Sequence, residues 1–300
     1  MSEGRSGAAK SAESASLAPG LYLVATPIGN LEDITLRALR VLKEVDLIAC
    51  EDTRHTQKLL NHYGITTRTV SYYQQNEMMR APELVLQMEQ GARIALVTDA
   101  GMPGISDPGY RLVALAIRHH LPVVPVPGVS AFLAALAASG LPTDSFHFGG
   151  FLPAKSGERR TLLEGLRASQ QTLVFYEAPH RVREALADLV ETLGGQRHIV
   201  LAREVTKIHE EFLRGTAAEV LEALTSRGEV KGEITLLIGK AESTEAQVAQ
   251  ASARLPAVRQ RLAEIMAQEK LDEKAALKKL AREYGISKSA AYRELQRSKA

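Results

Sequence analysis

The chain has 300 residues, 45% of them hydrophobic and 24% charged, which is the composition of a soluble globular protein of roughly two domains. No segment reaches the about 18 consecutive apolar residues of a membrane span, and the start of the chain lacks the apolar core of a signal peptide. The net charge is +2, but residues 250–300 contain 12 Lys/Arg and 6 Asp/Glu whereas residues 1–249 contain 25 and 29, so a basic tail suggests an anionic partner such as nucleic acid.

Strand-like and helix-like segments alternate after a Ser/Ala/Gly-rich start, residues 1–19, which we expect to be a disordered tail. Alternation of this kind is typical of βαβ units and an α/β fold. In the first half we expect strands at residues 21–25, 46–50, near 70, 93–97 and 122–126, and helices at 35–42, 53–63, 82–90 and 110–119. The prolines in 122–126 indicate an edge strand. Cys50 is the only cysteine, which fits a reducing cytoplasm, and a small buried side chain is favoured over a catalytic thiol.

The second half begins with an Ala-rich helix that Pro127–Ser130 caps and Gly140 ends. Its strands are expected at residues 146–150, 172–176, 198–202, 211–214 and 233–238, with helices at 158–167, 180–193 and 217–225. Because these strands follow one another more closely, the second sheet is expected to be mixed. We therefore predict two α/β domains, residues 20–126 and 127–241.

A helical block at residues 254–300 is expected beyond a linker at 242–253. Within it, Lys278–Leu295 has two amphipathic stretches about Gly285, with Ser287 as a cap. This pattern resembles a helix-turn-helix, whose second helix contacts nucleic acid. The alternative is a plain three-helix satellite without such a role.

The loop Thr98–Gly109 carries three glycines, two prolines and two aspartates directly after a buried strand. Open α/β sheets bind ligands at the carboxyl ends of their strands, so this loop is a candidate site. Asp99 either accepts hydrogen bonds from ligand hydroxyls or an amine, or is a turn residue. The chain lacks a phosphate loop, GxGxxG, HExxH, paired CxxC and GxSxG, so kinase, ordinary dehydrogenase, zinc and hydrolase interpretations lose support and no metal is expected.

Three charged segments also follow predicted strands. In the segment Glu51–Arg54, Asp52 either caps a helix, or the charged residues bind substrate or take a proton. Tyr176–Arg181 places Glu177 at a strand end, and Arg181 either begins a helix or meets phosphate. Ala202–Glu211 forms either a solvated hairpin or a site for an anionic polymer.

Taken together, these loops resemble the tetrapyrrole methylase superfamily, and within it the branch that modifies ribosomal RNA. The resemblance covers about residues 21–239 and includes the terminal helical block. The motifs that carry it are Leu21–Thr35, Cys50–Arg54, Asp99–Pro108, Gly150–Pro153, Tyr176–Arg181 and Ala202–Lys207.

The resemblance implies a two-domain tetrapyrrole-methylase-like fold, a homodimer, and S-adenosylmethionine in the cleft between the domains. It implies methyl transfer to the ribose 2′-hydroxyl of a cytidine in the decoding region of 16S ribosomal RNA, with the 30S subunit as partner and no membrane. By motif position, the cofactor site is lined by Pro27, Asp99, Ala100, Gly101, Ser130, Ala131 and Tyr176. The candidates for the group that deprotonates the hydroxyl are Glu51, Asp52, Glu177, Glu204 and Lys207. The candidates for RNA contact are Arg54, Arg181, Arg203, Lys288 and Arg293.

Two alternative functions remain open at this stage. A tetrapyrrole C-methyltransferase acting on a corrin precursor would share the fold and cofactor. Against it stand the basic tail and the sequence Asp99–Gly101, where corrinoid-making relatives have Gly-Asp-Pro. A nucleic-acid-binding regulator would use the tail alone, and this interpretation gives the loop-rich body no function.

Overall fold

The computed structural model describes residues 16–241, 261–268 and 272–283, and the chain divides into two compact units, residues 1–241 and 242–300. Most of the predicted N-terminal tail, the linker at 242–253 and the second helix expected after Gly285 lie outside the described residues. In the second unit, residues 261–268 are helical and α10 spans Glu273–Glu283. Their apolar side chains form one small buried cluster: Leu262, Ile265, Ala276, Leu277, Leu280 and Ala281.

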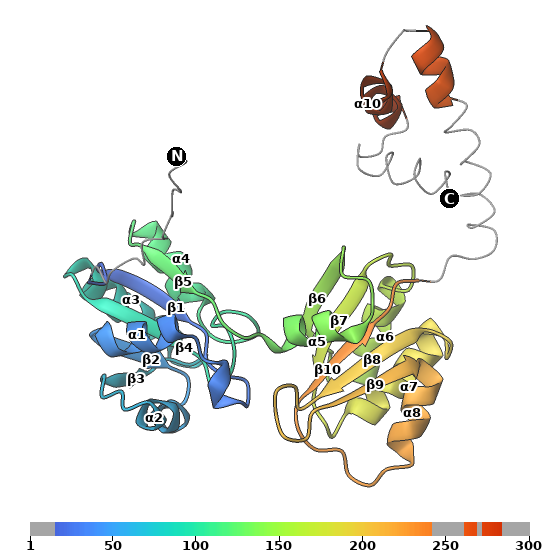
Figure 1. Cartoon of the computed structure of the whole chain (residues 1–300). Coiled ribbons are helices and arrows are strands. Elements are labelled where there is room, and N and C mark those ends of the chain that lie inside the picture. Colours follow the sequence, from blue (N-terminus) through green and yellow to red (C-terminus); the bar gives the residue numbers. More distant parts are fainter. Residues whose placement is uncertain (1–15, 242–260, 269–271, 284–300) are drawn as a thin grey trace, which may run out of the picture. The chain divides into compact units, whose positions relative to one another are not determined.

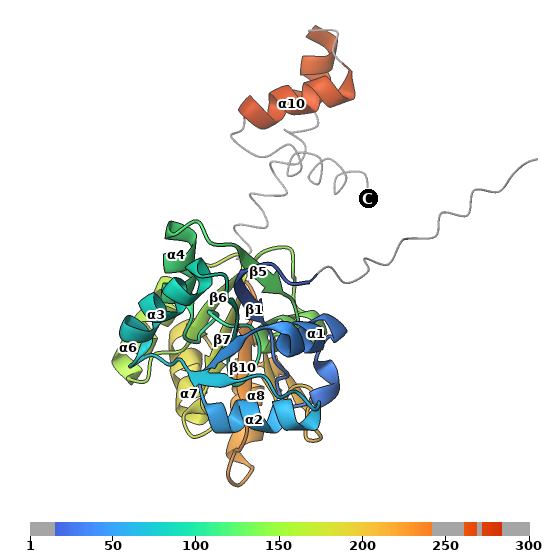
Figure 2. The same ribbon diagram turned by 90° about the vertical axis from the view of Figure 1, so that its left-hand side faces the viewer.

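The first sheet is wholly parallel, in the order β3-β2-β4-β1-β5 (Figure 1). Its strands are β1 (Gly20–Val24), β2 (Leu47–Cys50), β3 (Thr69–Ser71), β4 (Arg93–Val97) and β5 (Val123–Val126). The connecting helices are η1 (Leu31–Asp33), α1 (Leu36–Glu44), α2 (Thr53–His62), α3 (Glu77–Glu89) and α4 (Tyr110–Arg118). Helices α1 and α2 pack on one face, and α3 and α4 pack on the other, as Figure 2 shows for α1, α3 and α4. Both faces are covered, which explains the continuous apolar runs of the strands.

Two local predictions can be compared with this sheet. The edge position of the proline-bearing strand is confirmed, since β5 pairs only with β1 and lies at the end of the sheet. The start of α3 was predicted wrongly at Pro82, because the helix begins at Glu77 and Pro82 lies inside it. Proline lacks the amide that would bond to the carbonyl of Met78. Met78 is 62% exposed, so water can satisfy that carbonyl and the helix continues.

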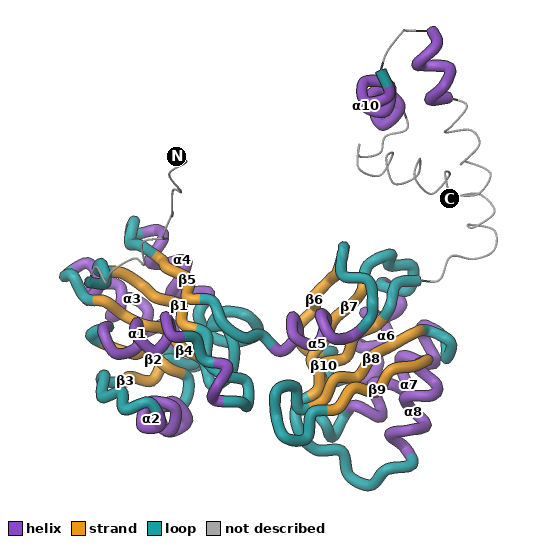
Figure 3. The backbone as a smooth tube through the Cα atoms, in the orientation of Figure 1, coloured by secondary structure: helices purple, strands orange, loops and turns teal. Residues whose placement is uncertain are grey.

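The second sheet is mixed, as predicted, in the order β6-β7-β10-β8-β9. Only β6 and β7 are parallel, and the other pairs are antiparallel. Its strands are β6 (Phe146–Phe151), β7 (Thr172–Glu177), β8 (His198–Arg203), β9 (Glu211–Thr216) and β10 (Ile234–Ile238). Its helices are α5 (Ala131–Ser139), α6 (Ser156–Gly165), α7 (Val182–Leu193) and α8 (Ala217–Thr225), joined by the loops coloured teal in Figure 3.

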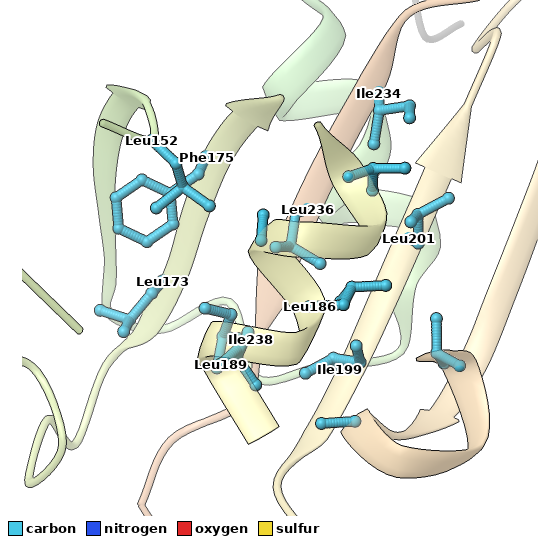
Figure 4. Close-up of a cluster of buried hydrophobic side chains, with 14 of the residues drawn as sticks. Leu152, Leu173, Phe175, Leu186, Leu189, Ile199, Leu201, Ile234, Leu236 and Ile238 are labelled. Carbon is cyan, nitrogen blue, oxygen red and sulfur yellow. The ribbon is translucent and has the colours of Figure 1, made fainter. Parts of the chain in front are cut away.

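The main core of this half lies between the sheet and helices α6, α7 and α8. Figure 4 shows Leu186 and Leu189 of α7 among inward side chains of β7, β8 and β10. On the opposite face, α5 covers Val174, Val200 and Leu237. Burial of apolar surface stabilises the packing of these layers by about 25 cal/mol for each Å². Within the described ranges, no helix has the length and apolar character of a membrane span.

Candidate functional site

The loops after β1 and β4 are joined to each other beyond the sheet. Thr26 and Gly101 exchange two backbone hydrogen bonds, N to O, of 2.9 and 3.0 Å. The hydroxyl of Thr26 also donates to the carbonyl of Thr98 at 3.0 Å. Gly101 has φ +84°, a conformation that glycine adopts without strain. The buried parallel strands therefore hold a short, rigid backbone edge at their carboxyl ends.

A cavity of about 360 Å³ lies against this backbone edge and is called the main cavity below. It is walled by loops and strand ends of both sheets. Its lining residues are Ile28, Ala100, Gly101, Met102, Ile105, Ser106, Asp107, Ser130, Ala131, Phe151, Tyr176, Glu177, Ala178, Pro179, Val205, Gly232, Glu233, Ile234 and Thr235. Five of the seven residues predicted for a cofactor are among them. Pro27 and Asp99 instead line a neighbouring side cavity of about 260 Å³, which His55 and Lys58 also line.

Aromatic side chains form a continuous series that ends in the main cavity. Phe132 stacks on Phe148 with ring centroids 4.2 Å apart, and Phe148 meets Tyr176 edge-on at 5.1 Å. Tyr176 in turn lies 5.5 Å from Phe151, which is 57% exposed. Such packing fixes the orientation of Tyr176 and leaves one face of Phe151 accessible to a planar ligand.

Glu177 is a buried carboxylate at the wall of the main cavity, 2% exposed. Its Oε1 accepts hydrogen bonds from the amide of Ala178 at 2.7 Å and from Arg181 at 3.0 Å. Its Oε2 is buried and has no hydrogen-bond partner among the described residues. A buried carboxylate oxygen without a donor is costly, so this atom is suited to receive a donor from a ligand.

Three carboxyl groups gather where β2 and β4 end, namely Glu51, Asp99 and Asp107. Asp99 joins the two strand ends, since its Oδ1 accepts the amide of Asp52 at 3.2 Å. Burial, followed by repulsion from Glu51 and Asp99, raises the pKa of Asp107 to about 7. Burial, with Asp99 and Asp52, also raises the pKa of Glu51. The cluster therefore favours a cation or a proton donor nearby.

A second depression of about 740 Å³ runs between α3 and α4 and is called the α3–α4 groove below. Its lining residues are Glu51, Gln74, Glu77, Met78, Ala81, Pro82, Ser106, Asp107, Pro108, Gly109, Tyr110, Arg111, Ala114, Leu115 and Arg118. Ser106 and Asp107 line both this groove and the main cavity.

The remaining predicted acid–base residues are held in ion pairs. Asp52 caps α2 through the amide of Arg54 at 2.8 Å, and that residue's side chain lowers the pKa of Asp52 to about 2. Lys207 lies 2.7 Å from Glu204 and 3.1 Å from Glu233. Although burial opposes it, these partners raise the pKa of Lys207 and keep it protonated at neutral pH. The pairing with Lys207 likewise outweighs burial and lowers the pKa of Glu204.

The arginines predicted to contact RNA differ in accessibility. Arg54 has 88% of its side chain exposed, beside Asp52. Arg181 bonds to Glu177, and Arg203 pairs with Glu211 at 3.2 Å, so both also stabilise the fold. Lys288 and Arg293 lie outside the described residues.

Sequence reasoning gave no role to several residues of the main cavity. Asp107 and Ser106 belong to the glycine-rich loop that was predicted as a candidate site. The sequence of that loop alone does not distinguish the role of Asp107 from that of Asp99. Gly232 and Glu233 lie directly before β10, and Ile234 and Thr235 are its first residues, so none of them follows a strand end. Their position becomes visible only when the antiparallel pairing of β10 with β7 and β8 is known. The described residues contain no cluster of His, Cys, Asp and Glu that could hold a metal ion.

Comparison with protein families defines the class of this chain. The family of tetrapyrrole (corrin/porphyrin) methylases matches residues 20–221. Among solved structures, uroporphyrin-III-C-methyltransferase from Thermus thermophilus covers 74% of this chain and 94% of its own, with a TM-score of 0.53 and 22% identity. A diphthine synthase covers 73% and 89%, with a TM-score of 0.57 and 15% identity. Both structures share the fold.

Closer relatives are found among proteins named ribosomal RNA small subunit methyltransferase I. The protein of Mesorhizobium japonicum is 48% identical over 279 residues, which is 93% of this chain and 92% of the relative. The protein of Halalkalibacterium halodurans is 52% identical over 226 residues, 75% of this chain and 78% of the relative. The chain belongs to the tetrapyrrole methylase family, and within it to the ribosomal RNA small subunit methyltransferases I. It is a methyltransferase.

Proposed function

We propose that this chain transfers a methyl group from S-adenosylmethionine to the ribose 2′-hydroxyl of a cytidine in the decoding region of 16S ribosomal RNA. The observation that supports it most is the main cavity, with its rigid backbone edge and the unpaired oxygen of Glu177. Relatives named for the ribosomal small subunit share about half of the sequence. The structural neighbours give no support to a tetrapyrrole substrate, because a likeness at 22% identity shows the fold alone.

The residues of the main cavity fit the chemistry of this cofactor. An adenosyl sulfonium carries a flat base, two ribose hydroxyls, an ammonium and a positive sulfur. Apolar side chains such as Ile28, Ala131 and Ile234 suit the base, and Oε2 of Glu177 suits a hydroxyl or ammonium donor. The acidic cluster around Asp107 suits the positive sulfur. When bound, the cofactor supplies a methyl group on a sulfonium, activated toward a nucleophile.

The protein's own contribution is to hold both reactants together and to exclude water. The Thr26–Gly101 bridge fixes the backbone edge, and the aromatic series fixes Tyr176 opposite it. Orienting two reactants in this manner can supply several kcal/mol of a barrier, roughly 7–11 at the extreme. A ribose hydroxyl is a weak nucleophile, so a nearby base must take its proton as the bond forms.

The assignment of ribosomal RNA as the methyl acceptor is supported by the charge distribution of the chain as well as by its relatives. The last 51 residues carry twice as many Lys/Arg as Asp/Glu, 12 against 6. We propose that the basic helical block predicted at residues 254–300 binds ribosomal RNA, with Lys288 and Arg293 contributing. Arg54 is a further accessible cation on the first unit. Binding of this kind neutralises phosphates and weakens as salt rises.

The test is to offer labelled S-adenosylmethionine together with purified 30S subunits that lack the modification. Label in 16S ribosomal RNA supports the proposal. Label in a corrin precursor instead would favour a tetrapyrrole C-methyltransferase, and no transfer to either acceptor would favour a nucleic-acid-binding regulator. A protein acting on ribosomal subunits would work in the cytoplasm. We also propose a homodimer, which sedimentation of the purified chain would test.

A further inference from the structure

The main cavity and the α3–α4 groove meet at two residues, Ser106 and Asp107. A methyl donor in the main cavity and an acceptor in the groove would therefore face each other across this pair. The side chain of Asp107 is half-buried, and it makes no hydrogen bond or ion pair within the described part of the chain. Its carboxylate is thus available at the point where donor and acceptor meet.

The backbone on both sides of Asp107 adopts unusual conformations. Ser106 has φ +63°, a left-handed conformation that is strained for serine. Gly109 has φ +146°, and an added Cβ would lie 3.0 Å from Leu96 and 3.2 Å from the amide of Gly104. On the other side, the Cβ position of Gly150 lies 3.5 Å from the hydroxyl of Ser106. Left-handed backbone conformations at residues other than glycine cluster at functional sites.

We propose that Asp107 is the general base of the transfer and that the acceptor nucleotide lies in the α3–α4 groove. This inference rests on the proposed function. In the step, the carboxylate of Asp107 takes the proton of the ribose hydroxyl while the hydroxyl oxygen forms a bond to the methyl carbon. The bond between that carbon and sulfur breaks, and its electron pair stays on sulfur as a neutral thioether. Asp107 then releases its proton to water.

The charges around Asp107 suit it to this role better than the other acids. Its pKa of about 7 makes it a stronger base than Asp52, whose pKa is about 2, and about half of the Asp107 side chains are still ionised at neutral pH. Lys207 is protonated at neutral pH and cannot accept a proton. Glu51 lines the groove but not the main cavity, so it acts on the pKa of Asp107 from one side. The charged and titratable groups that face Asp107 or line the two spaces around it are Glu51, Glu77, Asp99, Tyr110, Arg111, Arg118, Tyr176, Glu177 and Glu233.

The groove itself is suited to a nucleotide. Arg111 and Arg118 of α4 supply positive charge, and 48% of the Arg111 side chain is exposed beside Glu77. Tyr110 is 81% exposed at the same edge and offers an aromatic face. Cations with an adjacent exposed ring are the usual means of holding a phosphate backbone and an unstacked base.

The experiment compares wild type with Asp107→Asn and Glu51→Gln, using 30S subunits and labelled S-adenosylmethionine across pH 5.5 to 9. We expect Asp107→Asn to lower kcat about 100-fold or more, while calorimetric binding of S-adenosylmethionine weakens by about tenfold at most, because one of several carboxylates near the sulfonium is lost. In wild type, kcat/KM should fall as pH decreases through about 7, because the base becomes protonated. Glu51→Gln removes a repelling charge, so its acid limb should move to lower pH. Glu158→Gln, an exposed change on α6, is the matched control.

The outcomes separate the two proposals. If wild type transfers no label to 16S RNA, the proposed function is wrong. If wild type is active and Asp107→Asn keeps its rate and acid limb, Asp107 is not the base. If Glu51→Gln abolishes transfer at every pH while Asp107→Asn remains active, the base is Glu51. Thermal unfolding of each variant identifies a loss of activity that comes from misfolding.

Discussion

Glu177 illustrates how one side chain can serve both fold and site. One oxygen holds Arg181 and the amide of Ala178, while the other lies buried at the cavity wall without a donor. Asp107 is the second such residue, because burial and the nearby carboxylates of Glu51 and Asp99 disfavour its ionised form. Each has an unfavourable electrostatic feature in the ligand-free protein that a ligand or proton would relieve. Destabilised groups of this kind cluster at functional sites.

Replacing Glu177 with Gln keeps the shape but removes the negative charge. We expect S-adenosylmethionine binding to weaken roughly tenfold, because a hydrogen bond to a charged group contributes about 1.5–3 kcal/mol. Isothermal calorimetry measures this change, with Glu164→Gln on the exposed side of α6 as the control. Unaltered affinity would show that the free oxygen of Glu177 does not meet the cofactor.

The raised pKa of Asp107 also predicts a gain in stability on neutralising it. A carboxyl with a folded pKa of about 7 is bound to a proton in the folded state over a pH range where the unfolded chain has lost it. Its stabilising proton is therefore present at low pH and is lost as pH rises through about 7. Asp107→Asn should raise the free energy of unfolding at pH 8 by about 1 kcal/mol and change it little at pH 4. Urea titrations at both pH values test this, and an equal effect at both would contradict it.

At the scale of elements, the loops of the two halves meet through glycines. The side chain of Lys207, in the β8–β9 loop, occupies the space where Gly29 would carry a Cβ, 2.4 Å from the Lys207 Cγ. Within the second half, the side chain of Glu204 occupies the Cβ position of Gly232 in the same way, with its Cδ at 2.5 Å. The predicted charged hairpin therefore serves as a packed connection, with Glu233 as the second partner of Lys207.

Gly29→Ala should displace Lys207 from both carboxylates and reduce the free energy of unfolding by about 1–3 kcal/mol. In a Lys207→Ala background the same change should cost less, because only the strain at φ +144° remains. Gly157→Ala, at an open helical position on α6, should instead stabilise by about 0.5–1 kcal/mol. Chemical denaturation of the four variants tests the coupling, and additive effects would disprove the contact.

Part of the fold and part of the candidate site could be predicted from the sequence. Apolar runs and helix-ending glycines predicted the strands and most helices, because those signals are local, as at Gly140, which ends α5 in a left-handed conformation. The start of α3 was missed since Pro82 reads as a helix start. The meeting of Glu51, Asp99 and Asp107 could not be foreseen, since it depends on β2 and β4 being neighbours in the sheet. The same holds for Glu177 and residues 232–235, which antiparallel pairing brings together.

At the scale of the whole chain, a nearly neutral protein divides its charge between two units. Residues 1–241 contain 25 Lys/Arg and 27 Asp/Glu, and residues 242–300 contain 12 and 8. The main cavity, the α3–α4 groove and the acidic cluster all belong to the first unit. We infer a division of labour in which the first unit performs the transfer and the second provides affinity for RNA.

Truncation after Ala241 tests that division. We expect the shortened chain to bind S-adenosylmethionine as well as the full chain does, while its RNA affinity falls and depends less on salt. Filter binding at several salt concentrations measures the slope of log K against log salt. A slope equal to that of the full chain would mean that residues 242–300 make no phosphate contacts.

The most direct test of the central claim is nucleoside analysis of the methylated product. After reaction of the full chain with unmodified 30S subunits and isotopically labelled S-adenosylmethionine, the 16S RNA is digested to nucleosides and examined by mass spectrometry. We expect labelled 2′-O-methylcytidine, with the label on the ribose. Label on a base, on another nucleoside, or on no RNA at all would contradict it.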